Sequence, residues 1–307
     1  MPPQRLNALI LAAGRASRMG VPKVLLPAGR GHTLLSRVLA TALASVDGQV
    51  VTVLGRDAEL CRTEVERYLE GAPQHRTRIT LIENPHYVEG LSTSLRCGVK
   101  ELRLEPASGL MILLADQPAF TEIQARDLAQ TFRARRPDTV AVAAAENGER
   151  RNPVVFSADL LPELSSVTGD RGARGVLEEY GGRVQRLELG SGPWFVDADD
   201  WATYAGLMRG RGWLEEVSVP EFEGEASAEL VESIVSTLEQ EPKPLLTPDV
   251  LLVGVEHRSV QGVARLERSP LRTLSEQGVK TVVIGDGTSP RASLDLLRRA
   301  ALWTLQR

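Results

Sequence analysis

The stretch LILAAGRASRMGVPK, residues 9–23, decides the fold that this sequence predicts. The apolar run from Leu6 to Leu11 alternates little between apolar and polar residues, which is typical of a parallel strand buried on both faces. Gly14 then allows the backbone to approach a ligand closely, and three cations follow, namely Arg15, Arg18 and Lys23. Cationic side chains and the free N–H groups of the following turn neutralise phosphate oxygens. The stretch therefore predicts a loop that holds a nucleoside triphosphate; the alternative is an exposed turn that only connects a strand to a helix.

This loop matches neither GxxxxGK[ST] nor GxGxxG, the two commonest phosphate-binding patterns. The segment LAAGRASRMGxPK, which begins at Leu11, instead resembles the opening signature of the MobA-like NTP transferases, nucleotidyltransferases related to molybdenum cofactor synthesis. The resemblance covers about residues 5–208 and implies that this segment surrounds the incoming nucleotide. It assigns nucleotide binding to Leu11, Ala12, Ala13, Gly14 and Lys23. It assigns catalytic roles to Arg15, Arg18 and Lys23 and, farther along the chain, to Asp116.

The composition predicts a soluble protein with small-molecule ligands. Of the 307 residues, 42% are hydrophobic and 4% are aromatic, which suffices for an aliphatic core in one large domain and a smaller one. The net charge of −4 comes from interspersed acidic and basic residues, so no basic face predicts binding to nucleic acid or to an anionic membrane. The apolar run Leu6 to Ala13 is too short for a membrane span or a signal peptide, so we expect a cytoplasmic protein.

The cysteines and histidines predict neither a disulfide framework nor a zinc site. Cys61 and Cys97 lack the spacing of metal ligands, and two cysteines in a chain of this length are typical of ordinary buried or half-buried thiols. The four histidines are scattered in the sequence and form no pattern such as HExxH; they are His32, His75, His86 and His257.

Apolar runs alternate with helical patterns along the first two thirds of the chain. This order predicts an α/β fold, a mostly parallel doubly wound sheet with helices on both faces, as in a Rossmann variant. Ligands of such sheets bind beyond the carboxyl ends of the strands. The expected strands are 6–13, 50–54, 79–82, 110–114, 140–144 and 183–189, and the expected helices are 34–45, 58–69, 92–102 and 123–135.

The remaining part of the chain carries no family resemblance. The pattern loosens around residues 210–224, which predicts a domain of residues 1–212 and a smaller α/β domain of residues 213–307 of unknown role. Within the latter we expect helices over 226–240 and 291–305 and strands over 250–255 and 279–284. Gly285-Asp286-Gly287 is either a second anion site or a plain turn.

Two acidic segments are candidates for binding Mg²⁺. Asp116 lies in LLADQP, residues 113–118, directly after an apolar run, where its carboxylate can reach the cleft; the alternative is a turn-forming aspartate. The segment FVDADDW, residues 195–201, offers a second carboxylate. It is one residue shorter than the family's segment and lacks its proline, so the ligand is open among Asp197, Asp199 and Asp200. The match favours Asp197 as the ligand and Asp200 as a helix cap.

The resemblance also implies contacts with the base and with the second substrate. In NPHYVEGLSTS, residues 84–94, Gly90 lets a flat base approach, while Ser92 and Ser94 either bind the nucleotide or serve as plain helix caps. The positions that border the acceptor pocket are Asn152, Pro153, Asp170 and Arg174. Asp170 with its neighbouring arginines suits a phosphorylated acceptor, and the alternative is a capped helix start with a solvated charge pair.

The activity that the resemblance implies is nucleotidyl transfer, in which an acceptor phosphate attacks the α-phosphorus of a nucleoside triphosphate and pyrophosphate leaves. The Leu-Ala-Ala-Gly form resembles the cytidylyltransferases, whereas guanylyl-transferring relatives show Leu-Ala-Gly-Gly, so Ala13 favours CTP. The implied acceptor is molybdopterin bearing molybdenum, and an apo-molybdoenzyme or its chaperone would receive the product.

Three alternatives stay open. The first keeps the chemistry with another phosphorylated acceptor, such as a sugar phosphate. The second is a glycosyltransferase that acts on a nucleotide sugar through an Asp-x-Asp pair, which Asp197-Ala198-Asp199 fits literally. The third is a nucleotide-sensing or cofactor-carrier module without activity.

Overall fold

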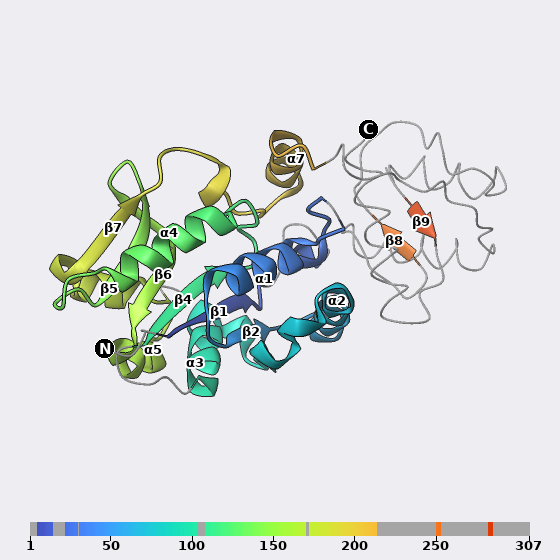
Figure 1. Cartoon of the computed structure of the whole chain (residues 1–307). Coiled ribbons are helices and arrows are strands. Elements are labelled where there is room, and N and C mark those ends of the chain that lie inside the picture. The colour runs from blue at the N-terminus through green and yellow to red at the C-terminus, as the bar shows by residue number, and fades with distance from the viewer. Residues whose placement is uncertain are drawn as a thin grey trace. The chain divides into compact units, whose positions relative to one another are not determined.

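A seven-stranded mixed sheet forms the centre of the larger of two units (Figure 1). The computed structural model describes residues 5–14, 22–29, 31–102, 108–169 and 172–213, together with two short strands at 250–252 and 282–284. Residues 1–15 and 34–198 make up the larger unit, and residues 16–33 and 199–307 make up the smaller one. The domain boundary near residue 212 stays a prediction.

The sheet is mostly parallel, which confirms the predicted fold class. Its strand order is β3-β2-β1-β4-β6-β5-β7, and β1 to β4 run parallel to one another. β6 runs antiparallel to both β4 and β5, and β7 is parallel to β5. The strands are β1 (Leu6–Ala12), β2 (Val50–Leu54), β3 (Ile79–Glu83), β4 (Gly109–Leu114), β5 (Ala141–Glu146), β6 (Glu149–Ser157) and β7 (Val184–Glu188).

The apolar run near the start of the chain becomes β1, an interior strand of the sheet, and every one of its seven residues is buried. Helices cover both faces of the sheet, as parallel strands require. Leu11 of β1 pairs with Val53 of β2 on one side and with Leu114 of β4 on the other. The register places the carboxyl ends of these three strands together at one edge.

Two helix layers enclose the sheet (Figure 1). One face packs against α1 (Leu34–Ser45) and α4 (Glu122–Arg133), and the other packs against α3 (Leu91–Glu101). A capping box of Thr121 and Gln124 begins α4. The other helices of the larger unit are α2 (Ala58–Gly71), α5 (Leu161–Ser166), α6 (Arg174–Glu179), η2 (Pro73–Arg78), η3 (Tyr87–Glu89), η4 (Ala158–Leu160), η5 (Gly181–Arg183) and η6 (Pro193–Phe195).

β6 was not predicted, because its first half is charged and a proline interrupts it. The sequence ERRNPVVFS becomes apolar and buried only after Asn152. Polar residues at the start of a strand are tolerated where they face a cavity or solvent, so the usual apolar alternation is missing from this half.

The described part of the smaller unit contains η1 (Lys23–Leu25), α7 (Trp201–Gly210) and an antiparallel pair of short strands, β8 (Val250–Leu252) and β9 (Val282–Ile284). The pair confirms strands inside the two ranges expected there. Tyr204 of α7 is fully buried, and its hydroxyl donates to the carbonyl oxygen of Pro27 over 2.7 Å. The helices expected at 226–240 and 291–305, and the turn at Gly285 to Gly287, lie outside the described residues.

Within the residues that the structure describes, the helices are all too short or too polar to cross a membrane.

Candidate functional site

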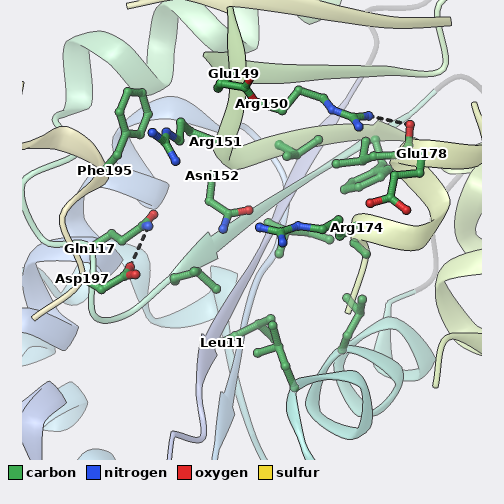
Figure 2. A pocket seen from close by; sticks show the side chains of 18 residues that line it. Leu11, Gln117, Glu149, Arg150, Arg151, Asn152, Arg174, Glu178, Phe195 and Asp197 are labelled. Atoms are coloured by element: carbon green, nitrogen blue, oxygen red, sulfur yellow. Dashed lines mark hydrogen bonds between the residues drawn. The ribbon is translucent and has the colours of Figure 1, made fainter. Parts of the chain in front are cut away.

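A cavity of about 720 Å³ opens in the larger unit beside the carboxyl ends of β1 and β4 (Figure 2). Its apolar side comes from the two strand ends, from α3 and from α6; it includes Leu11, Leu91, Leu95, Ile112, Leu114 and Leu177. Its polar side comes from β6, from α6 and from the segments after β4 and η6; it includes Gln117, Glu149, Arg150, Arg151, Asn152, Arg174, Glu178 and Asp197. A cavity with an apolar lining and a few converging polar groups is the usual form of a small-molecule site.

Asn152 and Arg174 point into this cavity from different elements (Figure 2). Asn152 lies on β6, and Arg174 begins α6. Over the described ranges, no hydrogen bond or ion pair engages either the amide or the guanidinium. Both groups are therefore available to a ligand, an amide as donor and acceptor and a guanidinium as a cationic donor.

Two neighbouring arginines of β6 are bonded to protein groups. Arg150 Nη1 donates to the carbonyl oxygen of Leu177 over 2.6 Å, and Arg151 Nη2 pairs with Glu146 over 3.1 Å. The Arg150 bond ties β6 to α6 at one border of the cavity (Figure 2). Arg150 therefore helps to shape the cavity, and its guanidinium is less available to a ligand than that of Arg174.

The segments that carry Asp116 and Asp197 lie side by side. The backbone N–H of Ala198 donates to the carbonyl oxygen of Asp116 over 2.9 Å. The amide of Gln117 donates to Asp197 Oδ1 over 2.8 Å (Figure 2). Asp116 is half-buried and Asp197 is exposed. The structure thus brings together the two segments that carry the predicted metal ligands; Asp197 lines the cavity, whereas Asp116 is not among the lining residues.

An aromatic contact holds the second of these segments. The rings of Phe120 and Phe195 lie 6.3 Å apart between centroids with planes tilted by 43°. Tilted aromatic pairs at such distances contribute about 1 kcal/mol beyond their buried area. Phe195 also lines the cavity, so this contact fixes one of its corners.

The three neighbouring aspartates of the segment after η6 have different partners. Asp197 accepts from Gln117 in the larger unit. In the smaller unit, Asp199 Oδ1 accepts from Lys23 Nζ over 2.6 Å, and Asp200 caps α7 by accepting from the N–H of Thr203 over 2.7 Å. The cap predicted at Asp200 is confirmed. Lys23 is itself buried, with a side chain that is 10% exposed.

The end of β1 runs into a tightly packed turn. Leu11 lines the cavity, Ala12 and Ala13 are buried, and Gly14 is exposed. A Cβ atom added to Gly55 would lie 2.9 Å from Ala13 Cα and 3.0 Å from Ala13 Cβ. Only glycine at residue 55 leaves room for this turn. Arg15 and Arg18 lie outside the described residues.

The residues predicted to contact the base are largely engaged within the protein. Gly90 precedes α3 with a φ of 116°, a conformation that favours glycine. The Ser92 hydroxyl is buried and donates to the carbonyl oxygen of Gly169. The Ser94 hydroxyl is also buried and accepts from the Asn84 amide over 3.0 Å. Neither serine lines the cavity or caps its own helix.

Of the predicted acceptor positions, Asn152 and Arg174 line the cavity. Pro153 is buried and follows a cis peptide bond. Asp170 lies outside the described residues. The polar and aromatic lining residues that were not predicted from the sequence are Gln117, Glu149, Arg150, Arg151, Phe195 and Glu178. Their positions in the sequence could have indicated them, because several are close neighbours of a predicted site residue. The polar run ERRN, residues 149–152, also directly precedes a buried apolar run.

Neither cysteine has the environment of a reactive thiol. Both are free, Cys61 buried and Cys97 half-buried. Burial is the main cause that raises the pKa of each thiol, and it outweighs the lowering by Arg62 at Cys61 and by Lys100 at Cys97. Among the described residues, no group of three or more histidine, cysteine, aspartate or glutamate side chains gathers as a metal cluster.

One family profile and three curated proteins are similar in sequence to this chain. The profile of the MobA-like NTP transferase domain matches residues 8–184. The purine catabolism protein PucB of Bacillus subtilis is 34% identical over 70% of this chain and 93% of its own length. The nicotine blue oxidoreductase of Paenarthrobacter nicotinovorans is 29% identical over 64% of this chain and 86% of its own length. The molybdenum cofactor cytidylyltransferase of Escherichia coli is 28% identical over 60% of this chain and 88% of its own length.

Solved structures share the fold. Rv0371c from Mycobacterium tuberculosis, crystallised as a complex with manganese, is 26% identical and matches with a TM-score of 0.52 over 67% of this chain and 99% of its own. A nucleotidyl transferase from Methanothermobacter, 24% identical, matches with a TM-score of 0.53 over 67% of this chain and 99% of its own.

Proposed function

Since the chain belongs to the MobA-like NTP transferase family and is a nucleotidyltransferase, we propose that it transfers CMP from CTP to molybdopterin bearing molybdenum. A phosphate oxygen of the acceptor forms a bond to the α-phosphorus of CTP, the bond between the α-phosphorus and the bridging oxygen breaks, and pyrophosphate leaves with that electron pair. An ionised acceptor phosphate needs no general base. Positioning and charge neutralisation then carry most of the catalysis.

The observation that carries the proposal is the joining of the Asp116 and Asp197 segments beside the cavity. Carboxylate oxygens are the ligands that Mg²⁺ prefers, and Mg²⁺ usually takes one or two of them while keeping several waters. Asp116 and Asp197 would hold such an ion, and a bound Mg²⁺ supplies charge stabilisation to the phosphates. The manganese complex of Rv0371c supports a divalent metal in this fold.

The cations of the opening motif are proposed to neutralise the triphosphate and the departing pyrophosphate. These are Arg15, Arg18 and Lys23, which the family motif carries in the same order. A positive charge aimed at oxygens that gain charge in the transition state lowers the barrier to transfer. The Lys23–Asp199 ion pair is the contact that a phosphate would have to replace.

Asn152 and Arg174 are proposed to bind the acceptor. Their polar groups have no partner among the described residues and face a cavity with a broad apolar side. A guanidinium suits a phosphate, and an amide beside an apolar surface suits the edge of a flat ring that donates and accepts hydrogen bonds. Molybdopterin combines a phosphate with such a ring, and the cytidylyltransferase relative supports this acceptor.

Ala13 and the cytidylyltransferase relative support CTP as the nucleotide. The glycosyltransferase alternative is disfavoured, because Asp197 and Asp199 have different partners in the two units. Another phosphorylated acceptor would keep the same reaction.

The test is release of pyrophosphate by the full chain with Mg²⁺, using molybdenum-bound molybdopterin and a sugar phosphate as separate acceptors and CTP, GTP and ATP as separate donors. We expect release with CTP and molybdopterin that greatly exceeds every other pairing. Preference for the sugar phosphate would reject the acceptor, and absence of release with any pairing would reject the function.

A further inference from the structure

One wall of the cavity depends on side chains of other elements. We call residues 167–169 and 172–179 the wall segment; it includes α6 and contributes Arg174, Leu177 and Glu178 to the cavity. α6 spans only six residues and has no side-chain cap. Helices this short do not form alone in water, so contacts with the rest of the protein must hold the wall in place.

Three side chains outside the wall segment donate to its backbone carbonyls. Ser92 donates to Gly169, and Arg96 donates to Val167; both donors belong to α3. Arg150 of β6 donates to Leu177 over 2.6 Å. The carbonyls on both sides of Arg174 are therefore fixed, two before it and one after it.

Ser92 is a buried residue whose hydroxyl connects α3 to the wall segment. Its side chain belongs to a residue that is 1% exposed, and its hydroxyl proton is directed at Gly169. Gly169 itself is exposed, so the bond ties an exposed part of the wall segment to a buried side chain of α3, and its loss leaves the buried end of α3 without this contact to the wall segment. The family resemblance implies that Ser92 contacts the nucleotide, whereas the structure places its hydroxyl against the wall segment.

We propose that Ser92 and Arg96 are positioning residues for the acceptor, which act by holding the wall segment that carries Arg174. α3 follows directly on Gly90, so the same helix that begins beside the expected base site supports the acceptor side of the cavity. This inference rests on the proposed function in assigning the acceptor to that side. It changes the role of Ser92 from nucleotide contact to support of the second site.

The test compares Ser92→Ala and Arg96→Met with a matched control, Ser45→Ala. Ser45 is a buried serine of α1 whose hydroxyl donates to the Thr41 carbonyl over 2.8 Å, and it does not line the cavity. Amide hydrogen exchange of peptides that cover residues 172–179 reports the wall directly. The KM values for CTP and for molybdenum-bound molybdopterin, measured by pyrophosphate release, report the two sites separately.

We expect Ser92→Ala and Arg96→Met to raise wall exchange and the acceptor KM by about fivefold each, while the CTP KM changes by less than about twofold. Ser45→Ala should leave all three unchanged. Unchanged exchange in both α3 variants would overturn the inference, as would a rise in the CTP KM alone. A wild-type chain that releases no pyrophosphate would reject the proposed function, while hydrogen exchange would still decide whether Ser92 and Arg96 hold the wall. Arg96 is half-buried, so we expect Arg96→Met to fold. This variant can decide the inference if Ser92→Ala fails to fold.

Discussion

The backbone N–H of Ala198 donates to the carbonyl oxygen of Asp116 over 2.9 Å. This bond joins two chain segments that are far apart in sequence, and it places Asp197 next to the end of β4. The neighbouring bond from Gln117 to Asp197 repeats the connection through side chains. The candidate metal site therefore lies next to the carboxyl end of β4, and the backbone bond between its two segments holds it in place. Such a fixed arrangement is the preorganisation that charge stabilisation requires.

Lys23→Ala should weaken CTP binding and lower turnover. Lys23 is buried and charged, and a hydrogen bond to a charged group contributes about 2 kcal/mol, so we expect the CTP KM to rise about tenfold or more. Steady-state kinetics with varied CTP measure this. Lys100→Ala, which removes an exposed lysine of α3, is the control and should behave as wild type. Equal kinetics for both variants would remove Lys23 from the nucleotide site.

Ala13→Gly should lower the preference for CTP over GTP. Ala13 is buried directly after β1, and the family resemblance of this motif implies that glycine at this position accompanies guanylyl transfer. The ratio of kcat/KM for the two nucleotides measures the preference directly. If the ratio stays at the wild-type value, residues other than Ala13 determine the specificity for the base.

Gly55→Ala should damage nucleotide binding by displacing the turn after β1. The added Cβ would lie 2.9 Å from Ala13 Cα, and this overlap costs about 1 to 3 kcal/mol if the backbone must shift. We expect a lower free energy of unfolding and a higher CTP KM. Gly71→Ala is the matched control, since nothing lies within 4 Å of a Cβ there. A CTP KM unchanged by Gly55→Ala would show that the turn does not position the nucleotide.

Tyr204→Phe should destabilise the protein and change its response to high pH. The variant loses the 2.7 Å bond to the Pro27 carbonyl, which costs about 1 kcal/mol or more because the site is buried. Burial raises the pKa of Tyr204 well above its ordinary value near 10. The folded state therefore retains the phenol proton when the unfolded state releases it, and stability falls as the pH rises above about 10.

Urea unfolding between pH 8 and pH 11 measures both effects of Tyr204→Phe. Below pH 10 both states keep the proton, so this tyrosine gives no pH dependence there. The wild-type free energy of unfolding should fall more steeply above pH 10 than that of the variant. Parallel curves would contradict the assigned burial of the hydroxyl.

The fold was largely predictable because its signals are local. The helix over 34–45 and the strand over 50–54 have the predicted bounds, since apolar periodicity and apolar runs mark them without reference to the rest of the chain. The cap at Asp200 was predictable for the same reason. β6 was not, because its polar first half faces the cavity and its burial depends on the neighbouring strands.

The candidate site was predictable only in part. Residue type and motif order located Asn152, Arg174 and Asp197, which the structure places at one cavity. They did not reveal that Arg150 binds a carbonyl of α6 or that Ser92 binds Gly169, because both partners are distant in sequence. A serine near a helix start has the same sequence signature whether it caps the helix, binds a ligand or supports another segment.

The central claim is that Asp116 and Asp197 together hold the metal that CTP requires. The most direct measurement is the rate of pyrophosphate release against Mg²⁺ concentration for Asp116→Asn and Asp197→Asn, with Asp127→Asn, an exposed aspartate of α4, as control. We predict that each site variant loses about a hundredfold or more of the rate while its unfolding midpoint stays near that of wild type, and that the control retains full activity. Wild-type rates and Mg²⁺ dependence in both site variants would contradict the account.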